Sequence, residues 1–158
     1  MDFVNLLRRF ADAAARADTA GFAALFTPEG CYDDGFFGVH RGRAAIAAML
    51  ARFHEGGEAF RWQFDEPLAD ARIGYARYLF SYRSKQPESA GRLIVFEGMA
   101  RLAFDGALIA DYAEVFDRGV AFVQLGFAEP RIAKLLARYA QPNERVRAHL
   151  AWRERAAP

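Results

Sequence analysis

The sequence predicts an α+β domain in which N-terminal helices pack on one face of a curved antiparallel sheet. Two observations support this prediction. Apolar residues recur every three or four positions in the first third of the chain, which is typical of amphipathic helices, and from Phe60 onward they alternate with polar residues, as in half-buried strands. Helices followed by a run of strands favour a layer of helices over one sheet. The concave face of such a sheet is a natural place for a small ligand.

Length, charge and cysteine content narrow the possible functions. The 158 residues are expected to form one domain of ordinary size. With 21 basic and 20 acidic side chains, the chain lacks the strongly basic surface typical of nucleic-acid-binding domains. Its single cysteine, Cys31, cannot form an internal disulfide or a sulfur-based zinc site. Early charged residues and the lack of a long apolar run predict a soluble cytoplasmic protein with no membrane partner.

The first expected elements are helical. Apolar side chains follow helical spacing from Phe3 onward and predict a helix over residues 3–16. Asp18 and Thr19 can cap a second short helix that ends at Phe26. The next expected elements are a turn over residues 27–30, a strand over residues 31–34, a glycine-containing loop and an alanine-rich helix over residues 43–53.

Four longer strands are expected to follow. In FRWQFDE, residues 60–66, aromatic side chains alternate with polar ones. Asp105–Gly106 favours a tight hairpin between the last two strands. The other expected strands cover residues 72–83, 92–104 and 108–117, and a helix is expected over residues 129–140. Together the elements predict one α+β domain, residues 1–140, and a basic helical tail, residues 141–158.

Alternation within the strands predicts which side chains point inward. Tyr32 and Asp34 share one face of the first strand, so Asp33 is expected to face solvent. On the last strand the residues expected to share the inner face are Tyr112, Glu114 and Phe116. On the two strands before it, the residues expected to face inward are Tyr75, Arg77, Leu79, Ser81, Ile94 and Phe96, with Glu97 outward.

These inward residues suggest proton-transfer chemistry. A carboxyl group enclosed by aromatic rings has a raised pKa, because the loss of water disfavours its charged form, and such an acid can transfer protons near neutral pH. We therefore expect Asp34 or Glu114 to act as a general base. Tyr32 would donate a hydrogen bond, and Arg77 would stabilise developing negative charge. The alternative is a buried Arg77–Glu114 pair with a purely structural role.

Three segments, in this order and spacing, resemble the nuclear transport factor 2-like superfamily. They are FADAAARADTAGFAALFTPEG, VHRGRAAIAAM and AFDGALIADYAEVFD, and they span most of residues 3–117. The superfamily includes ketosteroid isomerases, limonene epoxide hydrolases and SnoaL-type polyketide cyclases. The resemblance implies a cone-shaped, strongly curved sheet around a central apolar pocket, and a homodimer. Because this fold hosts both enzymes and binding modules, the resemblance does not choose between them.

The resemblance also implies roles for particular positions. Tyr32 and Asp34 match a tyrosine and an asparagine that help to hold the attacking water in the epoxide hydrolases, and Asp34 also matches the general base of the ketosteroid isomerases. Glu114 matches the hydrolase aspartate that deprotonates water, and Arg77 matches a hydrolase arginine. The departures are Leu79 in place of the second hydrolase acid, Phe10 in place of the isomerase oxyanion tyrosine, and Ala100 near the protonated isomerase aspartate. Neither site is complete, so no named reaction transfers.

The expected substrate contacts come from the inward faces and from the loop over the presumed pocket. They are Phe37, His40, Trp62, Leu79, Ile94, Phe96, Tyr112 and Phe116. Trp62 has an alternative place in the core or in a dimer interface. The histidines lack metal-binding spacing, so neither a metal nor a cofactor is expected.

Two functions from different classes remain open. The first is a cofactor-independent acid–base enzyme, an isomerase, cyclase, dehydratase or hydrolase, acting on a small apolar molecule. The alternative is a non-catalytic dimeric module that binds a ligand or a protein. In both cases the expected homodimer forms through the outer face of the sheet. A third possibility is a purely structural dimer whose interface is the aromatic face of the strands.

Overall fold

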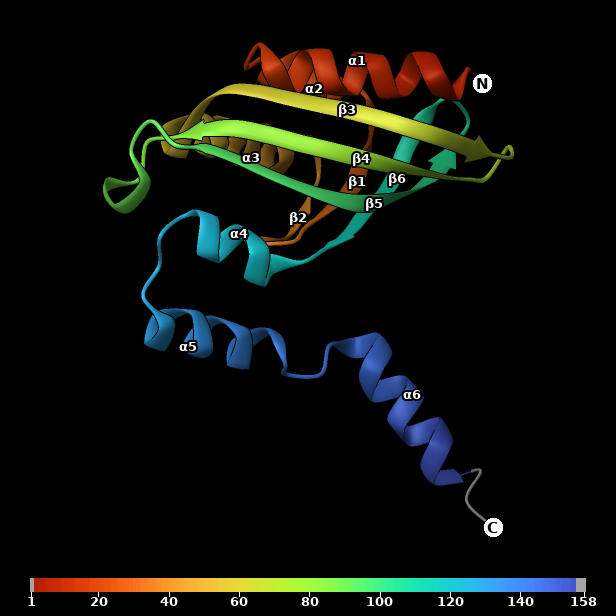
Figure 1. Cartoon of the computed structure of the whole chain (residues 1–158). Helices are drawn as coiled ribbons and strands as arrows, with labels where there is room; N and C mark the ends of the chain where they lie inside the picture. The colour runs from red at the N-terminus through yellow and green to blue at the C-terminus, as the bar shows by residue number, and fades with distance from the viewer. Residues whose placement is uncertain (1, 156–158) are drawn as a thin grey trace. The chain divides into compact units, whose positions relative to one another are not determined.

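A computed structural model gives the structure of residues 2–155 (Figure 1). The chain divides into two units, Met1–Gly126 and Phe127–Pro158, which are described separately. The sheet and every residue of the expected site lie in the first unit. Helix α5 (Glu129–Tyr139), which the sequence analysis grouped with the sheet, falls in the second unit.

Three of the four helices of the first unit begin at an aspartate whose side chain caps the helix. Asp2 accepts a hydrogen bond from the Asn5 backbone N–H at 3.0 Å, and Asp18 accepts one from the Gly21 N–H at 2.8 Å. Asp117 caps a helix that the sequence analysis did not foresee. The helices are α1 (Phe3–Ala15), α2 (Thr19–Ala24), α3 (Arg43–Gly56) and α4 (Arg118–Gln124). The expected helices near the N-terminus and after the first strand are thus confirmed.

Within the described residues the sheet has six strands in the order β2-β1-β6-β5-β4-β3. The strands are β1 (Phe26–Asp34), β2 (Gly38–Arg41), β3 (Gly57–Ala69), β4 (Ile73–Ser84), β5 (Leu93–Asp105) and β6 (Leu108–Phe116). Strands β3 to β6 form the expected antiparallel meander. The prediction of a fully antiparallel sheet is wrong, because β1 and β6 pair in parallel. Helix α3 and the four strands β2 to β5 lie between them in the chain, which is ample length for a parallel connection.

The first strand begins earlier than the sequence suggested. Residues 27–30, expected to form a turn, belong to β1. The pairing of β1 with β6 shifts register between Phe26 and Cys31, so Pro28 lies at an irregularity, where the absence of an N–H donor is tolerated. The segment expected to be a glycine-containing loop forms the short strand β2 in its second half.

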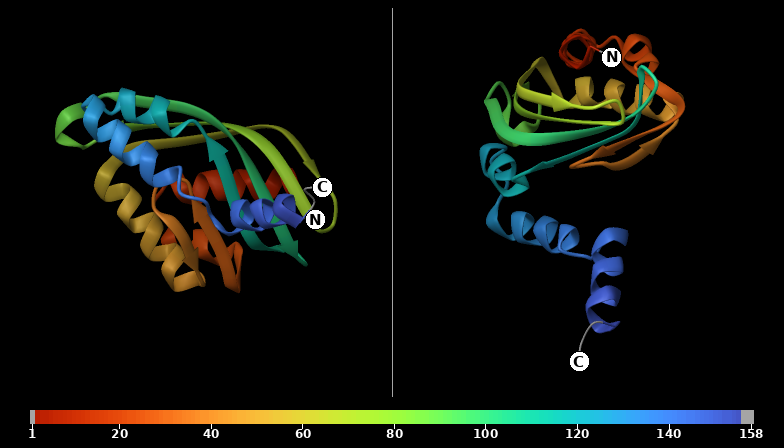
Figure 2. Two further views of the ribbon diagram at one scale, coloured as in Figure 1. Left: turned by 90° about the horizontal axis from the view of Figure 1, so that it is seen from below. Right: turned by 90° about the vertical axis from the view of Figure 1, so that its right-hand side faces the viewer.

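The core lies between the helices and one face of the sheet, which we call the inner face. Helices α1 and α2 lie over this face (Figure 2). Phe10 of α1 is fully buried, and its ring centroid lies 4.6 Å from that of Phe22 and 5.2 Å from those of Trp62 and Tyr112. Aromatic rings from α1, α2, β3 and β6 thus meet at the centre of the first unit.

The second unit consists of α5 and α6 (Glu144–Arg155), and neither helix contains a buried residue. The basic helix expected in the tail is α6, while residues 156–158 of that predicted segment lie outside the described residues. Across residues 2–155, every helix is too short or too polar to cross a membrane.

Candidate functional site

The parallel pairing of β1 with β6 brings the expected site residues together. Tyr32 lies directly beside Tyr112, and one residue further along Asp33 lies beside Ala113. Tyr32 and Tyr112 are fully buried and Asp34 is 3% exposed, whereas Asp33 faces solvent. The predicted inward and outward faces of both strands are therefore confirmed.

The carboxylate of Glu114 is the centre of a polar cluster on the inner face. The hydroxyl groups of Tyr112 and Tyr78 donate hydrogen bonds to Oε2 at 2.9 and 3.0 Å, and the Gly35 backbone N–H donates one to Oε1 at 3.4 Å. Burial, together with the nearby charge of Asp34, raises the pKa of Glu114 to about 7, although the three hydrogen bonds act in the opposite direction. An acid with this pKa can accept and return a proton near neutral pH.

Asp34 has a different task from Glu114. Its Oδ1 accepts the backbone N–H groups of Phe36 and Phe37, both at 2.7 Å, which shapes the turn between β1 and β2. Burial raises the pKa of Asp34, and the two backbone hydrogen bonds oppose the increase. The carbonyl oxygen of Gly35 in the same turn accepts a hydrogen bond from Arg118 Nε. Asp34 therefore holds the turn in place and contributes negative charge close to Glu114.

The three tyrosines around Glu114 are suited to donate hydrogen bonds. The rings of Tyr32 and Tyr112 stack with centroids 4.5 Å apart. Burial and the charge of Glu114 raise the pKa of Tyr32 and of Tyr112 well above the usual value, and they raise the pKa of Tyr78 as well, so all three phenols keep their protons. Within residues 2–155 the buried Tyr32 hydroxyl has no hydrogen-bond partner.

The expected orientation of β4 is wrong. Tyr75 and Leu79 lie on the outer face, 43% and 44% exposed. The Arg77 side chain is 55% exposed and lies 3.5 Å from Glu66 and 3.4 Å from Glu97, so it forms a solvated ion-pair network. The structure therefore contradicts both expected roles for Arg77, as a stabiliser of negative charge and as a buried partner of Glu114. It also contradicts the expected position of Leu79 on the inner face.

Tyr78 is the site residue that the sequence analysis missed. Strand β4 carries tyrosine in both alternating phases, Tyr75 in one and Tyr78 in the other, so aromatic content alone does not choose the inner face. The positions of the charged residues along β4 identify its inner face. The phase that contains Arg77 and Arg83 faces outward, and the phase of Gly74, Ala76, Tyr78 and Phe80, which has no charged side chain, is buried.

Some of the expected substrate contacts lie on the inner face of the sheet and others lie elsewhere. Ile94 and Phe96 are buried on the inner face, and the ring of Phe116 stacks on Phe96 with a centroid distance of 4.6 Å. Phe37, by contrast, is 62% exposed, and its position in the turn places it outside the inner face. His40 lies on β2 beside Tyr32, and its buried Nε2 has no hydrogen-bond partner among the described residues.

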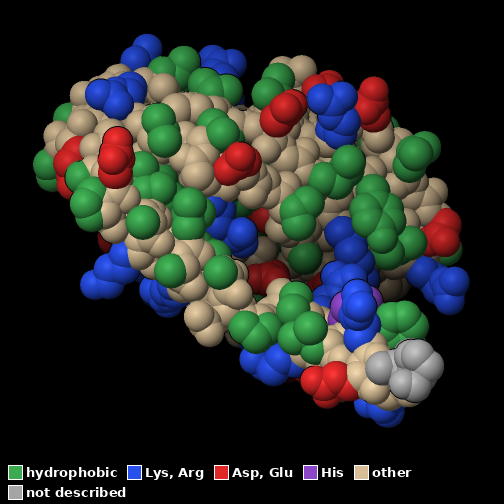
Figure 3. All heavy atoms as spheres, turned by 60° about the horizontal axis from the view of Figure 1, so that its bottom comes forward, with side chains coloured by type: hydrophobic (Ala, Val, Ile, Leu, Met, Phe, Trp, Pro, Cys, Tyr) green, Lys and Arg blue, Asp and Glu red, His purple; other side chains and the backbone are tan. Residues whose placement is uncertain are grey.

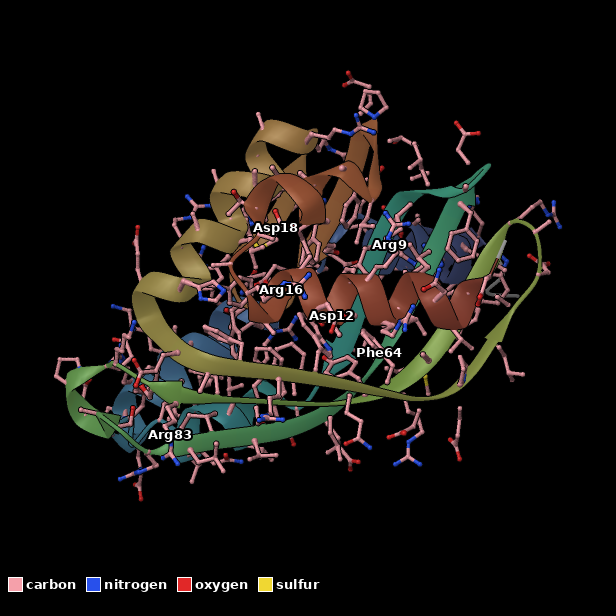
Figure 4. The ribbon with its side chains drawn as sticks, turned by 90° about the horizontal axis from the view of Figure 1, so that it is seen from above. Arg9, Asp12, Arg16, Asp18, Phe64 and Arg83 are labelled. Carbon is pink, nitrogen blue, oxygen red and sulfur yellow. The ribbon has the colours of Figure 1, made fainter. Side chains whose placement is uncertain are left out.

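Trp62 lies apart from the Glu114 cluster, in a groove between α1 and β3. The groove has a volume of about 270 Å³ and is lined by Val4, Leu7, Arg8, Ala11, Asp12, Trp62, Phe64 and Pro67. Figure 4 shows the two sides of the groove, with Asp12 on α1 and Phe64 on β3. Trp62 also contacts the ring of Tyr78 at a centroid distance of 5.7 Å, so only one ring separates it from Glu114.

The described residues contain no group of three or more histidine, cysteine, aspartate or glutamate side chains placed to hold a metal ion. Cys31 is buried, and burial and the neighbouring Asp111 raise the pKa of its thiol, which makes the reactive thiolate scarce. The acids and phenols around Glu114 can accept protons or donate hydrogen bonds, and the imidazole of His40 lies beside them on β2.

Comparisons with known proteins agree with this architecture. The profile of the SnoaL-like domain matches residues 7–112. A protein with a ketosteroid isomerase-like fold from Catenulispora acidiphila, solved in complex with trimethylamine, has a TM-score of 0.71 at 17% identity, covering 78% of this chain and 93% of that one. No curated protein matches the sequence.

Two further solved structures share the fold. A candidate polyketide cyclase from Xanthomonas campestris has a TM-score of 0.65 at 19% identity over 77% of this chain and 95% of that one. An epoxide hydrolase of the limonene epoxide hydrolase-like type from Mycobacterium tuberculosis has a TM-score of 0.63 at 17% identity over 86% and 95%. Together with the profile match across two thirds of the sequence, these findings establish that the chain belongs to the family of SnoaL-like domains.

Proposed function

We propose that this chain is a cofactor-independent acid–base enzyme that acts on a small, largely apolar molecule, with Glu114 as the group that takes and returns a proton. The observation that carries the proposal is the state of this carboxyl group. Burial brings its pKa to about 7, and two phenols fix one of its oxygens. An acid that is poised to change protonation at neutral pH is common at sites of proton transfer.

The substrate would lie against the inner face of a curved sheet, in an apolar pocket beneath the helices. The side chains of Ile94, Phe96 and Phe116 offer an apolar surface beside the Glu114 cluster. The unpartnered hydroxyl group of Tyr32 would donate a hydrogen bond to an oxygen of the substrate. A base, a hydrogen-bond donor and an apolar wall together favour removal of a proton from a carbon atom or from water.

The reaction class follows from these groups. Proton removal and return by one carboxylate serves isomerisation, cyclisation, dehydration or hydrolysis without a cofactor. The names of the structural relatives, a candidate polyketide cyclase and an epoxide hydrolase, support a reaction of this kind. Screening should begin with ketones, enols and epoxides.

The first test needs no substrate. We expect the side-chain carboxyl carbon of Glu114, followed by NMR, to titrate near pH 7, and the signal to be assigned by its loss in Glu114→Gln. A midpoint near the ordinary value of 4.5 would reject the proposal, because a solvated acid is a weak base at neutral pH. Glu97→Gln, on the outer face of β5, is the matched control and leaves the Glu114 titration in place.

A dimeric binding module is the second candidate, and the outer face of the sheet favours it. Cross-strand pairing places Met99 beside Val115, and both are exposed, at 41% and 69%. Leu79 on β4 and Val95 further along β5 extend this exposed apolar surface. Hydrophobic side chains on this side of the molecule are interspersed with charged ones (Figure 3). We therefore propose a homodimer that pairs two outer faces, in either functional class.

Val115→Lys tests the dimer directly. A lysine at this exposed apolar position would leave a charge unpaired in the interface, so we expect sedimentation to show a dimer for the parent chain and a monomer for the variant. Arg83→Lys, a change that keeps the charge on the same face, is the control. A parent chain that sediments as a monomer would contradict the proposed dimer and would leave the role of Glu114 open to its own test.

A further inference from the structure

The hydrogen bond between Tyr78 and Glu114 spans three strands. Tyr78 belongs to β4 and Glu114 to β6, and β5 lies between them. In the register of the sheet, Tyr78 lies beside Gly98 of β5, and Glu114 lies beside Ala100. The phenol must therefore cross the inner face of β5 to reach the carboxylate.

Strand β5 carries only small side chains where the Tyr78 side chain crosses it. Its inner-face residues there are Gly98 and Ala100, which have the smallest possible side chains, while Phe96 and Leu102 on either side are large. A Cβ atom placed on Gly98 would lie 2.5 Å from Cζ of Tyr78 and 2.7 Å from the carbonyl oxygen of Val115. Both distances are far below van der Waals contact, so the Tyr78 ring occupies the space that a side chain at position 98 would need.

We propose that Gly98 is a positioning residue for the candidate base: its lack of a side chain leaves the path across β5 through which the Tyr78 hydroxyl reaches Glu114. This inference rests on the proposed function of Glu114 and adds a residue that touches neither substrate nor base. The backbone φ of Gly98 is not in the left-handed region, so the need for glycine comes from close packing and not from the conformation of the main chain.

The test compares the Glu114 titration in three variants. Tyr78→Phe removes a hydrogen bond that favours the charged carboxylate, so the midpoint should move up by about one pH unit. Gly98→Ala should displace the Tyr78 ring and produce a similar upward shift. Gly74→Ala is the matched control. A Cβ there would also meet an aromatic ring, that of Phe3 of α1 at 2.6 Å, but it lies away from Glu114, so the midpoint should stay in place.

The outcomes separate the two proposals. A parent midpoint near 7 with no change in folded Gly98→Ala would overturn the role of Gly98 and leave the role of Glu114 intact. A parent midpoint near 4.5 would overturn the proposed function itself. If Gly98→Ala does not fold, the double variant Gly98→Ala/Tyr78→Leu decides. Recovery of folding would identify the Tyr78 ring as the obstacle, and continued failure would assign the obstacle to the Val115 carbonyl and reject the proposal.

Discussion

The two faces of the sheet hold the same kind of side chain in opposite states. On the inner face Glu114 lies among aromatic rings, receives hydrogen bonds from two phenols, and has its pKa raised to about 7 by burial. On the outer face Glu97 is 70% exposed at its side chain and lies 3.4 Å from Arg77. Water surrounds Glu97 and is largely excluded from the carboxylate of Glu114, because alternate positions along a strand face opposite sides of the sheet.

The difference shows where electrostatic energy is concentrated in this domain. An exposed pair such as Arg77–Glu97 contributes at most about 1 kcal/mol, because water and salt screen both charges. A buried carboxyl group is poorly screened, so its protonation state is tied to both folding and chemistry. The following changes test this contrast, from the largest expected effect to the smallest.

Replacing the inner acid should have the greatest effect. Once a substrate is found, Glu114→Gln should lower kcat by about 10² to 10⁴-fold, the usual contribution of a general base, and change the substrate Kd by less than about tenfold. Steady-state kinetics and calorimetry measure the two quantities. Glu97→Gln should alter neither. An equal loss of binding and turnover in Glu114→Gln would instead indicate a structural role for the carboxylate.

The aromatic core that encloses the site comes next. Phe10→Ala should lower the free energy of unfolding by about 3–5 kcal/mol, because Phe10 is fully buried and contacts rings from α2, β3 and β6. Tyr75→Ala, which truncates a 43% exposed ring on the outer face, should cost less than about 1 kcal/mol. Urea unfolding compares the two. Similar losses would show that the inner and outer faces contribute alike to stability.

The pH dependence of stability should reveal the buried acid. The folded-state pKa of Glu114 is about 7 against an ordinary value of 4.5, so between these values the folded chain holds a proton that the unfolded chain has released. Its contribution to stability is therefore present below pH 4.5 and is lost as pH rises through 7, a decline of about 3 kcal/mol. Urea unfolding across this window should show a flatter profile in Glu114→Gln. Parallel profiles would refute the assignment.

The outer-face pair should matter least. Arg77→Gln removes the cation between Glu66 and Glu97, and we expect the free energy of unfolding to fall by less than about 1 kcal/mol and the Glu114 titration to stay unchanged. Added salt should shrink even this small difference. A shift in the Glu114 titration would mean that Arg77 acts across the sheet, contrary to its exposed position.

The sequence predicted local structure well, because strand and helix periodicity are local signals. It also identified the inner residues of β1 and β6, where the alternation of Asp33 with Tyr32 and Asp34 admits one sensible choice. The inner face of β4 was predicted wrongly, because both of its alternating phases carry tyrosine and the resemblance to the epoxide hydrolases favoured the phase of Arg77. One step of alternation then exchanged the outer Arg77 for the inner Tyr78.

Two other features of the structure are not predicted by local sequence patterns. The parallel pairing of β1 with β6 joins segments that are far apart in the chain, and periodicity within a segment carries no information about its partner. The contact of Tyr78 and Tyr112 with Glu114 depends on the register of three strands and on the lack of a side chain at Gly98. Such contacts emerge only when the sheet is assembled.

The position of β6 between β1 and β5 has a consequence for how the chain is made. Gly35 and the Glu114 carboxylate that it contacts are 79 residues apart, and the strand between the two halves of the sheet is the last one synthesised. Until β6 leaves the ribosome, one edge of β1 and one edge of β5 have no neighbour in the sheet. Contacts over such long stretches form slowly, because the entropy of closing the loop must be overcome first. A nascent chain stalled before residue 108 therefore exposes two open strand edges, which are templates for aggregation and a reason for a chaperone to bind.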